Sequence, residues 1–364
     1  MVHCTFKHNS ADLGGAAYSD HGNPTFMNCT FTRNRARSGG ALHFRHLTRG
    51  TMVHCAFANN LAREVGGGLL IFQGLHCVLT ECSFIGNSAR QSGGGIMNSD
   101  SIMTLVNCRF VKNSSGEGGG ISNSNATSTF WPREASSRSD RAIDLSRTTS
   151  ATTFTSCRFL GNTASLGGGI LNVGGGPTLV NCLFVRNEAD EGGGVLNMPR
   201  EVPVSGETLM LVNCTFRGNA SPALRGGGIG QRDKASVTLE NCILWDNANS
   251  GDSVESMQIL GGTIRAANCC IQGWTGRLGG IGNFGLDPLF VDPDGPDGIA
   301  GTLDDDLRLQ PGSPCRDAGD NSALGADMAD LDKDGDVREP IPFDIERKPR
   351  IRGGIVDLGA YESD

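Results

Sequence analysis

The sequence has no long hydrophobic run, no helical periodicity and no excess of basic residues, and each absence excludes a class of protein. No stretch is apolar enough to cross a bilayer as a helix, so a transmembrane protein is not expected. Residues 1–286 carry 23 Lys and Arg against 19 Asp and Glu, without the basic stripe that nucleic-acid binding requires. The 53 glycines argue against helical repeats, because each internal glycine costs a helix about 1 kcal/mol relative to alanine.

A short motif that begins with cysteine recurs ten times along the chain. Eight copies read Cys-x-Phe-x-x-Asn, and two degraded copies follow at Cys242 and Cys269. The commonest spacing is 25 to 28 residues, a period typical of stacked supersecondary units. Cys and Phe stand two residues apart, so both point to one face of an extended strand. We expect interior ladders at Cys29, Cys55, Cys82, Cys108, Cys157, Cys182, Cys214, Cys242, Phe31, Phe84, Phe110, Phe159, Phe184, Phe216, Asn34, Asn87, Asn113, Asn162, Asn187 and Asn219.

A second signature, Gly-Gly followed by an apolar residue, comes several positions after most copies of the first, as at Gly94-Gly95-Ile96. Glycines permit a bend that a side chain would block. Short strands, tight corners and no helical period predict one coil of a right-handed parallel β-helix per repeat. A leucine-rich repeat has a similar length, but its leucine lattice is absent here. We therefore expect an all-β solenoid of about ten coils, stacked about 4.8 Å apart.

The predicted solenoid covers residues 1–285, and residues 286–364 form an irregular acidic segment that we expect to cap its open end. Residues 287–364 carry 20 Asp and Glu against 8 Lys and Arg, whereas the repeats are almost neutral. The step from Cys108 to Cys157 is 49 residues, about twice the period. We interpret residues 124–151 as an inserted loop, with a degenerate coil as the alternative.

Ten of the 13 cysteines occupy one slot of the repeat, which favours buried free thiols over a disulfide framework. Cys77, Cys270 and Cys315 lie outside that slot, and a bridge among them stays open. Met1 falls three residues before the first ladder cysteine, inside a predicted strand. A β-helix needs an end cap, so we expect a cap and an export signal upstream of Met1.

The strongest chemical signal is a group of alternating aspartates near the C-terminus. Carboxylates at alternate positions, with Gly335 at the sharp turn, are typical of a calcium loop. The twelfth position is Ile341 rather than Glu, so Asp327 or Asp344 would have to complete the site. A solvated turn is the alternative, and no other cofactor is expected. The predicted calcium ligands are Asp330, Asp332, Asp334 and Asp336, with a second, weaker group at Asp292, Asp294 and Asp297.

No residue pattern points to catalysis. Enzymatic β-helices need carboxylates or a basic group that converge on one exposed strand face. The outward positions of the predicted strands hold Thr, Arg, Asn, Leu and Ser without a concentrated acidic pair. We therefore expect a binding or architectural role and no catalytic residue. A polysaccharide lyase or glycosidase on the same scaffold is the alternative.

The paired signature resembles the repeats of chlamydial-type polymorphic outer membrane proteins over roughly residues 1–250. The tail is similar to the closing segment of bacterial right-handed β-helix surface proteins with variable C-terminal anchors, as in Asp287-Pro-Leu-Phe290 and Asp317-Ala-Gly-Asp320. These resemblances imply a secreted or outer-membrane, cell-surface protein with an adhesive role. The implied partner is a surface protein or an extracellular glycan, not nucleic acid, and the chain is expected to be monomeric.

Overall fold

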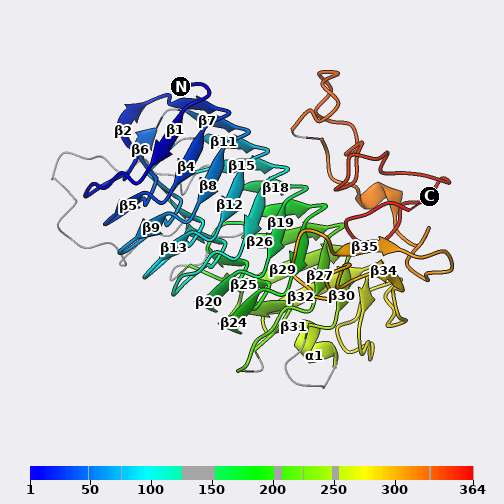
Figure 1. Cartoon of the computed structure of the whole chain (residues 1–364). Helices are drawn as coiled ribbons and strands as arrows, with labels where there is room; N and C mark the ends of the chain where they lie inside the picture. The colour runs from blue at the N-terminus through cyan, green and yellow to red at the C-terminus, as the bar shows by residue number, and fades with distance from the viewer. Residues whose placement is uncertain are drawn as a thin grey trace.

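Stacked parallel strands build a long rod (Figure 1). The structure, a computed structural model, describes residues 1–47, 49–74, 76–124, 152–200, 207–223, 225–247, 254–327 and 329–363. Within these ranges, three parallel sheets of ten, nine and nine strands run along the rod. Each coil contributes one strand to each sheet, which gives nine complete coils and one further strand. The predicted parallel β-helix is confirmed, and its coil number is close to the ten expected.

The strand bounds follow the sequence motifs. Sheet 1 contains β1 (Thr5–Lys7), β4 (Thr30–Thr32), β8 (Ala56–Ala58), β12 (Ser83–Ile85), β16 (Arg109–Val111), β19 (Arg158–Leu160), β23 (Leu183–Val185), β27 (Thr215–Arg217), β30 (Ile243–Trp245) and β33 (Cys270–Ile271). Sheet 2 contains β2 (Ala17–Gly22), β6 (Leu42–Leu47), β10 (Leu69–Phe72), β14 (Ile96–Ser99), β17 (Ile121–Ser124), β21 (Ile170–Val173), β25 (Val195–Met198), β28 (Ile229–Gln231) and β31 (Ile259–Leu260). Sheet 3 contains β3 (Thr25–Met27), β7 (Gly50–Val53), β11 (Cys77–Thr80), β15 (Met103–Val106), β18 (Thr153–Thr155), β22 (Thr178–Val180), β26 (Thr208–Val212), β29 (Ser236–Glu240) and β32 (Thr263–Ala267).

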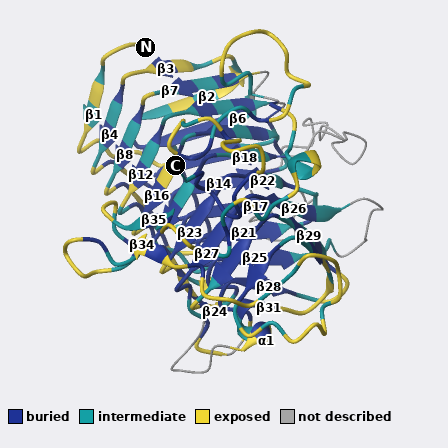
Figure 2. Ribbon diagram, turned by 90° about the vertical axis from the view of Figure 1, so that its right-hand side faces the viewer, coloured by how far each residue is buried: buried dark blue, intermediate teal, exposed yellow. Residues whose placement is uncertain are grey.

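Shorter elements complete the chain. They are β5 (Arg35–Ala36), β9 (Leu61–Ala62), β13 (Ser88–Ala89), β20 (Thr163–Leu166), β24 (Glu188–Glu191), β34 (Phe290–Asp292), β35 (Asp306–Leu309), the helix α1 (Glu255–Gln258) and a 3-10 turn at Asn321–Ala323. Figure 2 shows that the strands in the middle of the rod are buried, whereas the outer strands β1 and β4 are more exposed. None of the described helices is both long and apolar enough to span a membrane.

Identical side chains stack in register along the interior. Phe57, Phe84 and Phe110 of sheet 1 lie with neighbouring ring centroids 4.5 and 5.0 Å apart and with rings nearly parallel. Twelve of the 13 cysteines are buried, Cys4 is half-buried, and all 13 are free thiols. Cys270 and Cys315 belong to one apolar cluster, but no bridge joins them. Apolar burial along this ladder is the main favourable term in the rod.

A row of asparagines seals the corner that follows sheet 1. Asn113 is fully buried, and its Oδ1 accepts hydrogen bonds from the backbone N–H and the Nδ2 of Asn87, at 2.9 and 3.0 Å. Its Nδ2 donates to the carbonyl of Phe84 at 2.9 Å and to Oδ1 of Asn162 at 3.0 Å. Each amide therefore pairs polar groups of three coils that would otherwise be buried without a partner.

The polar residue before each ladder cysteine has a conformational role. Asn107 (φ 52°), Asn181 (φ 52°) and Asn213 (φ 50°) all adopt the left-handed conformation at the bend between sheets 3 and 1. Asn and His tolerate this conformation better than most residues, which explains the bias of the motif. The Gly-Gly motif is needed because the backbones of neighbouring coils approach closely. A Cβ on Gly94 would lie 2.4 Å from the carbonyl oxygen of Gly119 in the next coil.

Only the first part of the C-terminal segment lies at the open end of the rod. The carbonyl of Ile281 accepts a hydrogen bond from the N–H of Asn268. The carbonyl of Phe284 accepts from the N–H of Ile271, and the N–H of Phe284 donates to the carbonyl of Cys269, so this stretch covers the last coil. From residue 286 the chain turns back and lies along the outer face of sheet 1 (Figure 1). The outward residues there are apolar, and they pack with the segment in one cluster that includes Val111, Leu160, Val185, Ile243, Phe290, Leu309, Leu358 and Tyr361. Most of the acidic segment is therefore a side cover rather than an end cap, because this apolar strip needs burial.

The loop predicted at 124–151 lies outside the described residues except at Ser124, the last residue of β17. The strands on either side belong to one coil, since β15 pairs directly with β18 and β16 with β19.

Candidate functional site

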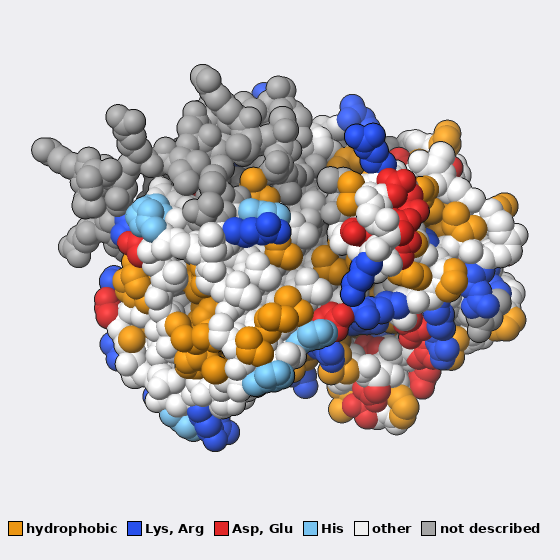
Figure 3. Space-filling view, turned by 90° about the horizontal axis from the view of Figure 1, so that it is seen from above, with side chains coloured by type: hydrophobic (Ala, Val, Ile, Leu, Met, Phe, Trp, Pro, Cys, Tyr) orange, Lys and Arg blue, Asp and Glu red, His pale blue; other side chains and the backbone are white. Residues whose placement is uncertain are grey.

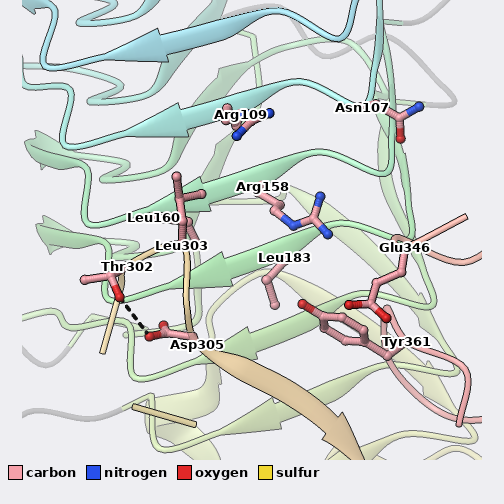
Figure 4. Close-up of a pocket in the computed structure, with 10 residues that line it drawn as sticks. All are labelled: Asn107, Arg109, Arg158, Leu160, Leu183, Thr302, Leu303, Asp305, Glu346 and Tyr361. Atoms are coloured by element: carbon pink, nitrogen blue, oxygen red, sulfur yellow. Dashed lines mark hydrogen bonds between the residues drawn. The ribbon is translucent and has the colours of Figure 1, made fainter. Parts of the chain in front are cut away.

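A cleft of about 230 Å³ lies between the outer face of sheet 1 and the C-terminal segment. Figure 4 shows two arginines on neighbouring strands of the rod, Arg109 of β16 and Arg158 of β19, and Arg158 extends toward Glu346 and Tyr361 of the segment. The rest of its lining is Asn107, Leu160, Leu183, Thr302, Leu303, Asp305, Glu346 and Tyr361. The cleft therefore joins residues that stand up to about 250 positions apart in the sequence.

The two arginines differ in their hydrogen-bond and ion-pair partners. A guanidinium nitrogen of Arg158 donates to the carbonyl of Ile345 at 3.2 Å, which ties the segment to the rod. Arg109 is exposed, and no carboxylate among the described residues pairs with it. A guanidinium presents a planar fork of donors that suits carboxylate, sulfate or phosphate oxygens. Arg109 is thus the group in the cleft that is open to an anionic ligand.

The acidic groups of the cleft already have partners. Asp305 accepts hydrogen bonds from the backbone N–H of Gly301 at 2.7 Å and from the hydroxyl of Thr302 at 3.3 Å (Figure 4). Burial raises the pKa of Asp305, and these hydrogen bonds oppose that shift. Glu346 pairs with Lys348 at 2.9 Å. Both carboxylates therefore serve the fold of the segment and leave the charge of Arg109 uncompensated.

Tyr361 and the leucines give the cleft an apolar wall. The Tyr361 side chain is buried, and burial raises the pKa of its hydroxyl although Arg158 opposes that shift. Leu160 and Leu183 project from adjacent strands of sheet 1 beneath it. A flat aromatic and aliphatic wall beside planar hydrogen-bonding groups suits a ligand with both apolar and polar faces, such as a sugar ring.

The calcium loop predicted from the sequence folds as a compact acidic turn. Asp330, Asp332 and Asp334 each offer a carboxylate oxygen, and these oxygens lie within 4.8 Å of one another. Gly335 (φ 89°) provides the sharp turn, and its N–H donates to Asp330 at 3.1 Å. Asp336 follows in the sequence but does not belong to the group, and its carboxylate accepts from the N–H of Arg338. Acidic side chains gather where the segment lies, on the right of Figure 3.

A second group shares Asp332 and reaches deeper into the segment. Asp327, Asp332 and Glu339 also offer oxygens within 4.8 Å of one another. Oδ1 of Asp327 and Oε1 of Glu339 are buried and have no hydrogen-bond partner in the described part of the chain. Burial raises the pKa of Asp327, and the charges of Asp332 and Asp330 raise it further. Buried carboxylate oxygens without donors fit a hard cation such as Ca²⁺.

The remaining acidic candidates have other roles. Asp344 is buried, and its carboxylate accepts from the backbone N–H groups of Glu346, Lys348 and Glu362, so it does not complete the loop. Asp294 pairs with Arg217 of β27 at 2.7 Å. Asp297 accepts from the backbone N–H of Ile299, and Asp292 is exposed on β34. The structure therefore does not gather Asp292, Asp294 and Asp297 into one ligand group.

Sequence reasoning missed the cleft. Arg109 and Arg158 share one signal, because both fill the position between the ladder Cys and Phe. The opposite wall of the cleft comes from the C-terminal segment, and no local motif predicts the path of that segment along sheet 1. Asp305 lies in an acidic stretch and Glu346 in a stretch of mixed charge, and both look like solvated tail when read alone.

The comparisons with known proteins agree with the architecture. Residues 1–131 match a family model described as the right handed beta helix region. No curated protein matches the chain. The family match and the three-sheet solenoid agree on a right-handed β-helix fold.

Proposed function

We propose that this chain is an exported bacterial β-helix protein that binds an acidic extracellular glycan, without catalysis, in the cleft beside Arg109. The observation that carries the proposal is the exposed guanidinium of Arg109, which pairs with no carboxylate among the described residues, in a cleft whose own carboxylates have partners. The resemblance of the repeats to polymorphic outer membrane proteins supports the location at the cell surface and the adhesive role.

The size of the cleft suits one unit of a longer chain. Pockets for small molecules usually enclose about 300 to 1,000 Å³, and this cleft holds about 230 Å³. A uronic acid unit could place its carboxylate on Arg109 and its ring against Leu160 and Tyr361. The neighbouring units would then lie along the outer face of sheet 1, where Ser83 and Ile85 of β12 continue the row of Arg109 and Val111.

Replacing Arg109 by glutamine is expected to weaken binding of oligogalacturonate about tenfold or more, since a charged hydrogen bond contributes about 1.5 to 3 kcal/mol. Isothermal titration calorimetry against oligogalacturonate and a neutral cello-oligosaccharide measures the effect. Arg90→Gln is the matched control, because Arg90 is an exposed arginine on the turn after β13. Failure of the unaltered protein to bind any acidic glycan, or equal binding by Arg109→Gln, would contradict the proposal.

Catalysis is the second candidate, because two arginines on neighbouring coils and two carboxylates of the C-terminal segment line the same cleft. A lyase would release unsaturated products from a uronate chain, and a glycosidase would release new reducing ends. Incubation of the protein with polygalacturonate is expected to give neither, because Asp305 and Glu346 are engaged in the fold. The appearance of either product would replace the binding proposal with an enzymatic one.

Calcium is expected to order the loop between Asp327 and Glu339. Trypsin should cleave after the exposed Lys333 at least about tenfold more slowly in calcium than in chelator, because a bound ion opposes local opening in proportion to its occupancy. Asp332→Asn removes the ligand common to both groups and should abolish this protection. Asp297→Asn changes a carboxylate outside them and should preserve it. Cleavage at the same rate with and without chelator would rule out the ion.

A further inference from the structure

A cluster of two histidines and an aspartate lies on the outer edge of sheet 2, away from the cleft on sheet 1. Asp20 and His21 lie near the end of strand β2 in the first coil, and His46 lies on β6 in the second coil, beside His21 in the register of the two strands. Nδ1 of His21 and Nδ1 of His46 each lie 2.9 Å from Oδ1 of Asp20. The imidazole rings lie 4.7 Å apart between centroids. Two ring nitrogens therefore lie close to one carboxylate oxygen.

The hydrogen bonds of His46 set its tautomer. Its Nε2 lies 3.0 Å from Oε1 of Gln73, which can only accept, so Nε2 carries the proton. The neutral ring then presents the lone pair of Nδ1 to Oδ1 of Asp20. Two acceptors at 2.9 Å repel each other unless a second proton or a metal ion lies between them. The arrangement thus calls for a positive charge at this point.

Asp20 and His46, the two less exposed ligands, also have outer partners. The hydroxyl of Tyr18 donates to Oδ2 of Asp20 at 3.3 Å, which leaves Oδ1 for an ion. The Tyr18 ring packs edge-on against His43. Gln73 is the outer partner of His46, because its Oε1 contacts Nε2 of the imidazole ring. Such outer partners fix the orientation and tautomer of metal ligands in known sites.

We propose that Asp20, His21 and His46 bind one first-row transition-metal ion, Zn²⁺ or a close relative, across the first two coils. Three nitrogen and oxygen ligands with a fourth position left to water match an open zinc site. Metal–ligand bonds of about 2.0 to 2.2 Å place tetrahedral ligand atoms about 3.3 Å apart. The ligand atoms here lie within 4.8 Å of one another, so small side-chain rotations reach that geometry. The side chain of His21 is 74% exposed, which gives an ion access from solution.

Asparagine is the appropriate replacement for these histidines. His21 (φ 54°), His46 (φ 49°) and His54 (φ 51°) all have left-handed backbones, which asparagine tolerates and alanine does not. His54 serves as the matched control, because its Nδ1 lies 3.0 Å from a Glu81 carboxylate but it has no second imidazole beside it among the described residues.

The test is calorimetric titration of the whole chain with ZnCl₂ in excess calcium, followed by visible spectroscopy of the cobalt-loaded protein. We expect one zinc equivalent and a tetrahedral cobalt spectrum. His21→Asn and His46→Asn should each lower affinity at least about 100-fold, and Tyr18→Phe about tenfold, whereas His54→Asn should bind like the unaltered chain. Circular dichroism checks folding, and the exposed His21 keeps the test valid if His46→Asn does not fold. Absence of binding, or equal affinity in His21→Asn, would overturn the proposal.

Discussion

Replacing Asn113 by alanine is expected to lower the free energy of unfolding by about 4 kcal/mol. The substitution leaves the backbone N–H of Asn87 and the carbonyl of Phe84 buried without their partners. An unsatisfied buried polar group costs about 1 to 3 kcal/mol, and the amide of Asn162 loses a donor as well. Urea denaturation followed by circular dichroism measures the change in midpoint.

The first asparagine of the same ladder is the control. Asn9 is exposed, and among the described residues its side chain bonds with Asn34 alone, so Asn9→Ala should cost less than about 1 kcal/mol. Equal effects at Asn9 and Asn113 would mean that position within the rod does not matter, which contradicts a buried ladder.

Replacing Phe159 by alanine is expected to destabilise the protein by about 3 to 5 kcal/mol, the usual cost of truncating a buried aromatic side chain. Phe159 is fully buried, and its ring stacks on Phe110 and Phe184 with centroids 4.9 and 4.7 Å apart. No neighbouring ring can fill the space, because each is held by its own coil. The same urea experiment reports the loss.

Phe6 provides the comparison at the end of the stack. Its ring is half-buried and stacks on Phe31 alone along the ladder, at 5.0 Å. Phe6→Ala should therefore cost clearly less than Phe159→Ala. A larger loss at Phe6 than at Phe159 would show that the middle of the ladder is not the best packed part of the rod.

The fold was largely predictable because the repeat itself encodes it. Cys, Phe and Asn at fixed spacing specify an inward strand and a sealed corner, and the residue before each cysteine specifies the bend. The path of residues 286–363 was not predictable in the same way. Its docking depends on the apolar outward residues of β16 to β33, such as Leu160 and Ile243, and on asparagines such as Asn181, whose Nδ2 donates to the carbonyl of Phe343.

The same distinction between local motifs and contacts of distant residues applies to the candidate sites. The loop at Asp330, Asp332 and Asp334 was visible in the sequence because its ligands are neighbours. The cleft at Arg109 and the cluster at His46 were not, because their groups come from different coils or from the returning segment. Side-chain alternation shows which residues face outward, but only the stacking of coils shows which of them meet.

The most direct test of the ladder interior is the number of reactive thiols in the folded and unfolded chain. Burial in the apolar core raises the pKa of thiols such as Cys77, so they should not react with Ellman's reagent at about pH 8. We expect at most one reactive thiol, Cys4, in the folded protein, and all 13 after unfolding in guanidinium without reductant. Several fast-reacting thiols in the folded chain, or fewer than 13 in the unfolded one, would contradict a core of stacked free cysteines.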